Sequence, residues 1–198
     1  MSKLIVSNIM SLDGRYVEGP DWPLEIMDAA FDAYNAERMR AADTLLTGRV
    51  TFEGFRDFWP SVAEDPDPRW TPTHREISRL NVATDKVVVS DSLTAEETRP
   101  YDNARIVGRA DAHEQIADLK RRTGGDILTF GSHTLWSDLL AQGLVDELHV
   151  MIGPIALGTG RPLLSRDAGV SLRVIGAPRV WEGSANVLVH YDVSRRTT

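Results

Sequence analysis

The stretch that decides the fold reads Thr44-Leu45-Leu46-Thr47-Gly48-Arg49-Val50-Thr51-Phe52-Glu53. It predicts a short buried strand over residues 44–47, a turn at Gly48, and a helix with Thr51 in capping position. Backbone N–H groups at such a helix start have no partners, and they suit phosphate oxygens. Arg49 adds a cation with fork geometry at the same place. The alternative is an ordinary turn with Arg49 solvated, and the stretch alone leaves both interpretations open.

The composition is typical of a globular protein. Of the 198 residues, 42% are hydrophobic and 26% are charged, and this length predicts a single domain over residues 1–198. A balance of 22 basic against 29 acidic residues gives a net charge of -7, which argues against nucleic acid or an anionic membrane as a partner. The absence of cysteine excludes disulfides, thiolate nucleophiles and cysteine-ligated zinc.

No export signal or membrane span is apparent in the sequence. The apolar runs are well short of the roughly 18 residues that a membrane span requires. The N-terminus lacks a basic region followed by an apolar signal core. We therefore expect a soluble, unexported protein that resides in the cytoplasm.

Apolar runs alternate with helical patterns along the first three quarters of the chain. Strands are expected over residues 3–10, 44–47, 86–90, 104–107 and 126–130. Helices are expected over residues 24–42, 71–80, 111–123 and 132–142, with Thr71, Asp111 and Ser132 as caps. Because Gly131, like Gly48, lies between a strand and a helix, a second set of free N–H groups is expected there.

The last quarter changes character. Strands are expected over residues 147–152, 172–175 and 186–193, with no long helix between them, and this spacing favours antiparallel pairing. The sequence therefore predicts an α/β fold. Its central sheet is mixed and mostly parallel, is flanked by helices, and has an antiparallel C-terminal edge.

Two aspartates lie on the first expected helix. Asp28 and Asp32 are one turn apart, so that both project from nearly the same side, next to an apolar stripe that includes Phe31. Either one alone can equally be a solvated surface residue. Trp22 places an aromatic side chain in the loop just before this helix.

Several common sites are excluded by their spacing. The histidines at 74, 113, 133, 149 and 190 do not fall at metal-ligand spacing, so no metal site is expected. The Gly-x-Ser-x-Gly elbow of α/β-hydrolases and the Walker phosphate loop are both absent. The pair Gly158-x-Gly160 resembles part of a dinucleotide fingerprint. Because it lies between expected edge strands, an ordinary loop is the simpler interpretation.

Five pieces of the sequence together resemble a known superfamily. They are Ser11-Leu12-Asp13-Gly14-Arg15, the block of residues 46–53, Val87-Val88-Val89-Ser90, Phe130-Gly131-Ser132, and Leu144-Val145-Asp146-Glu147-Leu148 leading to Pro154-x-x-x-Gly158-x-Gly160. In this order they resemble the dihydrofolate reductase-like superfamily. The branch they resemble contains the C-terminal reductase domain of the bifunctional riboflavin-biosynthesis deaminase-reductase, and the resemblance covers roughly the whole chain.

The resemblance implies a three-layer dihydrofolate reductase-like fold, NADPH as cofactor and hydride transfer to a small heterocycle. The residues that match cofactor-binding positions are Gly14, Gly48, Arg49, Thr51, Ser90, Gly131 and Ser132. Asp13 falls where the first strand meets nicotinamide and substrate. Dihydrofolate reductases use an acid on the first helix to bind the pterin ring, and that place matches Asp32, with Asp28 as the fallback. Trp22 is a candidate for substrate contact.

The reaction that the resemblance implies is that of 5-amino-6-(5-phosphoribosylamino)uracil reductase or of dihydrofolate reductase. The alternative is a non-catalytic NADP(H)-binding module used for sensing or assembly. Asp91, next to Ser90, would repel a 2′-phosphate if it faced the cofactor, which leaves the choice between NADPH and NADH open. The family further implies a homodimer, and a pteridine or ribosylamino-pyrimidine as the small-molecule partner.

Overall fold

The computed structural model describes residues 1–16, 26–122, 124–165 and 168–195. Trp22, the expected substrate contact, lies outside the described residues.

One eight-stranded sheet organises the described chain. Its order is β5-β4-β3-β6-β1-β7-β10-β9. The strands are β1 (Leu4–Ser11), β3 (Ala42–Gly48), β4 (Asp85–Val89), β5 (Ala104–Val107), β6 (Asp126–Phe130), β7 (Glu147–Gly153), β9 (Val170–Val174) and β10 (Val187–Arg195). The strands from β5 to β7 are parallel, whereas β10 pairs antiparallel with β7 and with β9. A short antiparallel ribbon joins β2 (Arg15–Tyr16) to β8 (Arg161–Pro162). The predicted mixed sheet with an antiparallel C-terminal edge is confirmed.

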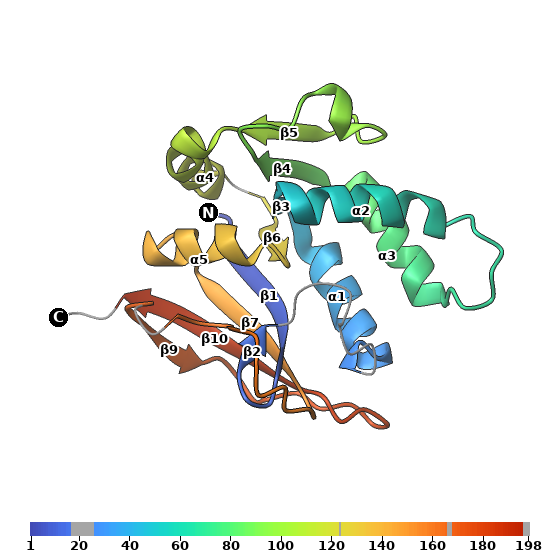
Figure 1. The fold of residues 1–198 in the computed structure, drawn as a ribbon, viewed down its shortest axis with the longest axis vertical. Helices are drawn as coiled ribbons and strands as arrows, with labels where there is room; N and C mark the ends of the chain where they lie inside the picture. Colours follow the sequence, from blue (N-terminus) through green and yellow to red (C-terminus); the bar gives the residue numbers. More distant parts are fainter. Residues whose placement is uncertain (17–25, 123, 166–167, 196–198) are drawn as a thin grey trace.

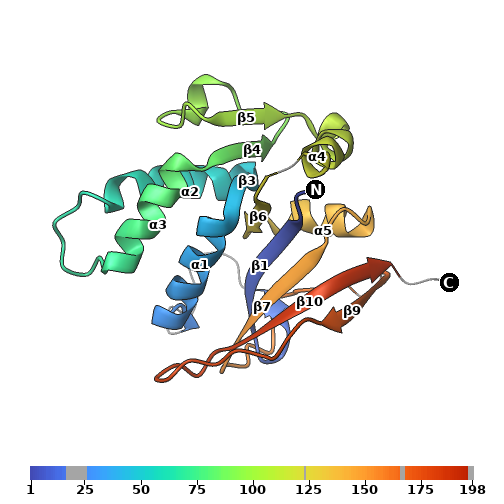
Figure 2. The same ribbon diagram turned by 180° about the vertical axis from the view of Figure 1, so that it is seen from behind.

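Helices cover both faces of this sheet (Figures 1 and 2). One face carries α1 (Ala29–Ala41), α2 (Arg49–Val62) and α3 (Pro72–Ala83), and the other carries α4 (Ala112–Arg121) and α5 (His133–Ala141). Short 3₁₀ turns, η2 (Glu96–Thr98) and η3 (Arg109–Asp111), lie beside β5. Among the described helices, none is long and apolar enough to cross a membrane.

Strand β1 shows why the chain forms three layers. Alternate side chains of a strand point to opposite faces. Leu4 belongs to the apolar cluster with Ile116 and Trp136 of α4 and α5, whereas Ile5 belongs to the cluster with Met39 of α1. Both faces of β1 are therefore buried, and its sequence shows no alternation of apolar and polar residues.

The start of α3 follows the predicted capping chemistry, whereas the predictions for α1 and α4 need correction, as does the side-chain cap predicted at Ser132 of α5, which forms no capping bond. Thr71 caps α3 as predicted, and its Oγ1 accepts a hydrogen bond from the backbone N of His74. Helix α1 begins at Ala29, later than predicted, because the Asp28 carboxylate caps it by accepting from the N–H groups of Ala30 and Phe31. The predicted capping box at Asp111 is wrong, since its side chain makes no capping bond and η3 precedes the helix.

The order of the strands creates a crevice between β3 and β6. After β3 the chain enters α2 on one face of the sheet, and after β6 it enters α5 on the other face. The two strands are neighbours and run parallel. Open α/β sheets bind ligands outside the carboxyl ends of their strands at such a reversal. Gly48 and Gly131 stand at the ends of these two strands.

A buried polar cluster lies far along the sheet, between α1, β7 and β10. His149 is 1% exposed, its Nε2 lies 2.8 Å from Glu147 Oε2, and its Nδ1 lies 2.5 Å from the Tyr34 hydroxyl. The ring of His190 stacks on it with centroids 3.9 Å apart. Burial lowers the pKa of His149 from 6.5 to about 4, despite the Glu147 carboxylate, which acts in the opposite direction.

This cluster predicts a loss of stability in mild acid. Between pH 6.5 and about 4 the unfolded chain binds a proton at residue 149 whereas the folded chain does not, so the free energy of unfolding falls as the pH falls through this window. The loss is at most about 3 kcal/mol. Urea unfolding at a series of pH values measures it. His149→Gln keeps a donor and an acceptor but does not titrate, and should flatten the profile. An identical slope in His149→Gln and the parent chain would contradict this assignment.

Candidate functional site

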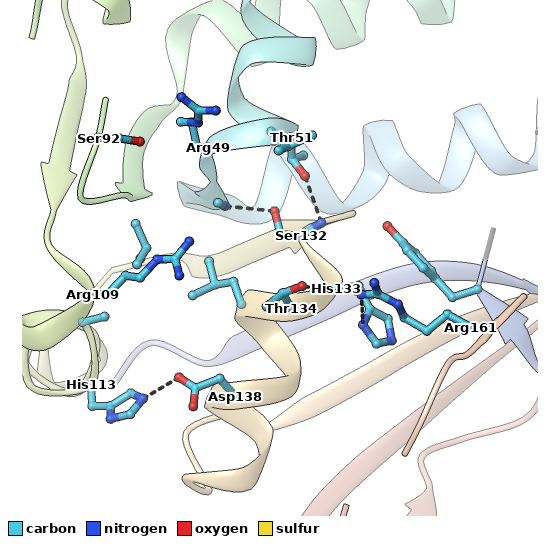
Figure 3. Close-up of a pocket in the computed structure, with 16 residues that line it drawn as sticks. Arg49, Thr51, Ser92, Arg109, His113, Ser132, His133, Thr134, Asp138 and Arg161 are labelled. Atoms are coloured by element: carbon cyan, nitrogen blue, oxygen red, sulfur yellow. Dashed lines mark hydrogen bonds and ion pairs between the residues drawn. The ribbon is translucent and has the colours of Figure 1, made fainter. Parts of the chain in front are cut away.

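Two side-chain hydrogen bonds tie the ends of β3 and β6 together (Figure 3). The backbone N of Gly48 donates to Ser132 Oγ over 3.0 Å, and the backbone N of Ser132 donates to Thr51 Oγ1 over 2.9 Å. Thr51 is therefore not the helix cap that the sequence predicted: α2 begins at Arg49 with Gly48 in the cap position. The N–H groups of Gly48 and Ser132, expected to be free, already have partners.

The turn at Gly131 and Ser132 is compact. Both residues lie in the left-handed region, with φ of 53° and 45°, where only glycine is free of steric cost. A Cβ added to Gly131 would lie 3.1 Å from Thr51 Oγ1 and 3.3 Å from its Cγ2. Glycine at this position thus serves both the backbone conformation and the close approach of α2.

A cavity of 1090 Å³ opens beside this turn, between the start of α2 and helices α4 and α5. We call it the arginine cavity, because its walls include Arg49 from the start of α2, Arg109 from η3 and Arg161 from β8. The other lining residues are Tyr16, Gly48, Val50, Thr51, Val89, Ser92, Ala112, His113, Ser132, His133, Thr134, Leu135 and Asp138.

Two of these arginines make weak contacts with neighbouring side chains. Arg49 lies with Nε 3.8 Å from Glu53 and is half-exposed. Arg161 approaches Thr134 Oγ1 at 3.5 Å. Together with two helix starts, these three guanidinium groups make the cavity suited to an anion with several charges, such as a set of phosphates.

Asp91 was expected to repel a 2′-phosphate if it faced the cofactor. Its carboxylate instead accepts from the backbone N of Arg109 at 2.7 Å and lies 3.7 Å from that residue's Nε. It is absent from the described walls of the arginine cavity. Asp91 therefore serves to hold the turn that carries Arg109.

Ser90 was expected to contact the cofactor, but the residue that lines the arginine cavity after β4 is Ser92. Ser90 is 5% exposed, and its Oγ accepts from the backbone N of Ser92 and of Leu93. This bonding closes the turn after β4 and leaves Ser90 outside the described lining. A direct contact from Ser90 to a phosphate is thus disfavoured by its surroundings.

A second cavity, of 560 Å³, lies on the other side of Gly131, over the face of the sheet that carries α1, α2 and α3. We call it the aromatic cavity because most of its wall is aromatic or apolar. Its lining residues are Ser7, Asn8, Ile9, Tyr16, Met27, Phe31, Asp32, Asn35, Met39, Phe55, Phe58, Trp59, Trp70, His74, Ile77, Asn81, Phe130 and Gly131. Tyr16 lines both cavities, so the two meet at Tyr16 and the Gly131-Ser132 turn.

Asp32 stands in the aromatic cavity with His74 as its partner. Asp32 Oδ2 lies 2.8 Å from His74 Nε2, and the two side chains are 17% and 23% exposed. The Nδ1 of His74 accepts a hydrogen bond from the backbone N of Thr71, so in the neutral ring the proton is on Nε2 and points to Asp32. Burial raises the pKa of Asp32, which His74 opposes.

The other two aspartates have different surroundings. Asp28 is the cap of α1 and is absent from the described walls of both cavities. Asp13 accepts from Ser11 Oγ, Leu157 N and Gly158 N, which tie the turn after β1 to the chain after β7. These hydrogen bonds, that of Ser11 first, lower the pKa of Asp13 to about 2. Gly14, with φ of 76°, completes this turn. Asp13 and Gly14 both lie outside the described cavity walls.

Sequence reasoning missed Arg109, Arg161 and His74. A signal for the two arginines was present: the dipeptide Gly-Arg occurs at 14–15, 48–49, 108–109 and 160–161, and every copy lies at the edge of the sheet where the parallel strands end or beside it. For His74 the sequence carried no comparable signal, because its partner Asp32 comes from another helix.

The comparison with known proteins agrees with this geometry. The sequence matches the RibD C-terminal domain family over residues 2–183. The chain belongs to this family. The resemblance inferred from the sequence is thereby confirmed, and with it a fold of the reductase type.

Three relatives illustrate the range of the family and the fold. The uncharacterized protein YyaP of Bacillus subtilis (strain 168) is 27% identical over 195 residues, which are 96% of this chain and 95% of that protein. Acinetobacter baumannii RibD is 17% identical with a TM-score of 0.65, covering 98% of this chain but 59% of the longer one. Dihydrofolate reductase from Enterococcus faecalis, complexed with NADP(H) and RAB-propyl, is 13% identical with a TM-score of 0.59, covering 98% and 97%.

The Gly131 turn yields a test by substitution. Gly131→Ala should lower the free energy of unfolding by about 1–2 kcal/mol, since alanine is strained at positive φ and its Cβ crowds Thr51. Gly54→Ala is the matched control, because Gly54 lies within α2, where a Cβ meets nothing within 4 Å. It should stabilise the protein by roughly 0.5–1 kcal/mol. Urea unfolding compares the two, and equal effects would show that the turn carries no strain.

Proposed function

We propose that the protein is an NADPH-dependent reductase of a small heterocyclic substrate. The observation that carries the proposal is that two cavities meet at Gly131. The arginine cavity carries three guanidinium groups, and the aromatic cavity contains the partly buried acid Asp32. Membership of the RibD C-terminal domain family supports a reductase. The predicted homodimer, the cytoplasmic location and the single domain over residues 1–198 stay predictions from the sequence.

The arginine cavity fits the phosphates of NADPH. Gly48, Thr51, Gly131 and Ser132 form the braced turn against which a pyrophosphate would lie. The guanidinium groups of Arg49 and Arg109 lie on the α2 and η3 sides of the same cavity, where they suit a 2′-phosphate. A bound NADPH would supply a hydride to the carbon of a C=N or C=O bond in the substrate, and the nitrogen or oxygen of that bond would take up a proton.

Asp32 is the residue that we assign to the substrate. Its carboxylate accepts from His74 and retains lone pairs for a ring N–H of the substrate. A negative charge near the ring favours the protonated, more electrophilic form of the acceptor. His74 holds Asp32 in place and is a positioning residue in this assignment. The wall of aromatic side chains surrounds the ring with apolar groups.

Arg49 tests the choice of cofactor. Arg49→Ala should weaken NADPH binding about 10- to 100-fold, the worth of a charge-assisted hydrogen bond to a phosphate, and should leave NADH nearly unchanged. Calorimetric titration with each cofactor measures both affinities. Arg40→Ala is the control, since Arg40 pairs with Glu76 away from the described cavity walls. An equal loss for NADPH and NADH would remove Arg49 from the 2′-phosphate site.

The two helix aspartates can be separated by the matched changes Asp32→Asn and Asp28→Asn. The first should lower kcat roughly 100-fold or more while NADPH affinity is retained, because a carboxylate at the ring is lost. The second should leave kcat close to that of the parent, since asparagine also caps helices. Steady-state oxidation of NADPH measures both. A larger loss of kcat in Asp28→Asn than in Asp32→Asn would assign the role to Asp28.

The alternative function, a non-catalytic NADP(H)-binding module, has its own test. Tight NADPH binding without turnover on pteridines and ribosylamino-pyrimidines would favour that module.

A further inference from the structure

The part of the aromatic cavity's wall that the structure describes contains no lysine and no arginine. Three arginines line the neighbouring cavity. We propose that the substrate is a planar heterocycle that carries no phosphate group, and this inference rests on the proposed function of the aromatic cavity as the substrate site. It departs from the phosphorylated substrate that the family resemblance suggests.

Two arginines that adjoin lining residues in sequence, Arg69 before Trp70 and Arg75 after His74, are engaged in other contacts. Arg75 of α3 donates to the carbonyl oxygens of Val62, Ala63 and Asp67. Arg69 pairs with Asp67 at 3.1 Å, and its guanidinium lies over the Trp70 ring, 4.8 Å from the centroid. Both side chains stabilise the connection between α2 and α3. Recruiting either to a phosphate would break these contacts.

The aromatic cavity contains an acidic side chain. Asp32 is the one carboxylate that the described walls carry, and its partner His74 presents Nε2–H to that carboxylate. A phosphate placed beside Asp32 would be repelled across a wall of low polarity, where charges are weakly screened.

The shape of the wall fits a flat ring. Phe58, Trp59 and Trp70 meet edge to face, with centroids 4.9 Å apart for Phe58 and Trp59 and 5.6 Å apart for Phe58 and Trp70. Phe31 and Phe55 line the same cavity from α1 and α2. Aromatic side chains arranged in this way offer both faces and edges to a planar ligand.

Asn8 supplies the complementary polar contact. It lies on β1 in the wall of the aromatic cavity and is 7% exposed, and its Nδ2 has no hydrogen-bond partner among the described residues. A buried donor without a partner is costly, so a ligand acceptor would satisfy it. With Asn8 as donor and Asp32 as acceptor, the wall matches a neutral or cationic heterocycle that carries a carbonyl oxygen or ring nitrogen and an N–H group.

Matched ligand pairs test the proposal directly. The first pair is 5-amino-6-ribosylaminouracil and its 5′-phosphate, and the second is riboflavin and its 5′-phosphate. Calorimetric titration of the full chain, with and without NADP⁺, measures binding without requiring hydride transfer. The unphosphorylated member of at least one pair should bind about 10-fold more tightly than its phosphate. Tighter or equal binding of the phosphorylated members, or no binding by either unphosphorylated ligand, overturns the proposal.

Two lysine substitutions provide the control. Phe58 lines the aromatic cavity and is 45% exposed, and Val82 of α3 is 44% exposed and outside the described lining. Phe58→Lys should strengthen binding of the phosphorylated ligands about 10-fold, whereas Val82→Lys should not. Equal affinities in the two variants would contradict the proposal. Since these readouts are binding constants, failure of the reductase function appears separately, as NADPH that binds but is not oxidised by any member of the panel.

Discussion

The reciprocal bonding of Gly48, Thr51 and Ser132 is the constraint on which the rest of the site depends. β3 and β6 are neighbours in the sheet, but the helices that follow them lie on opposite faces. The backbone at the two strand ends must therefore diverge, and two hydroxyl groups close the gap. Their bonding fixes the distance between α2 and α5, and with it the floor of both cavities. Ser132 adopts the left-handed conformation at a steric cost, and the hydrogen bond that its hydroxyl accepts from Gly48 N offsets part of that cost.

The division of charge between the two cavities follows from this arrangement. The arginines come from the start of α2, from η3 and from β8, where long side chains can reach around a helix start. The aromatic cavity is built from the inner faces of α1, α2 and α3, whose side chains are selected for packing. A ligand that spans both would have its anionic part on one side of Gly131 and its flat ring on the other. The fold thus separates recognition of charge from recognition of shape.

Local patterns in the sequence predicted much of the fold. Apolar runs ending at Gly48 and Gly131 located two strands and two helix starts, and Thr71-Pro72 located a third helix. Patterns of this kind fail where a polar side chain has more than one possible partner. Asp28 and Asp32 look equivalent along the helix, yet one binds the backbone of its own helix and the other binds His74. Thr51 and Ser90 were assigned roles from position. Thr51 Oγ1 accepts from the backbone N of Ser132, which only the tertiary structure brings near, whereas Ser90 Oγ accepts from backbone N–H groups within its own turn.

The double engagement of His74 limits what its ring can do. A proton can cross an imidazole only if one nitrogen takes it up while the other gives one away. Nδ1 accepts from the backbone N–H of Thr71, the cap residue of α3, so such a crossing would break the capping box at that helix start. The ring therefore holds Asp32 in position and is poorly suited to relay a proton. Any proton that reaches a ring bound at Asp32 has to come by another route, from water entering between the aromatic side chains or from the carboxyl group itself.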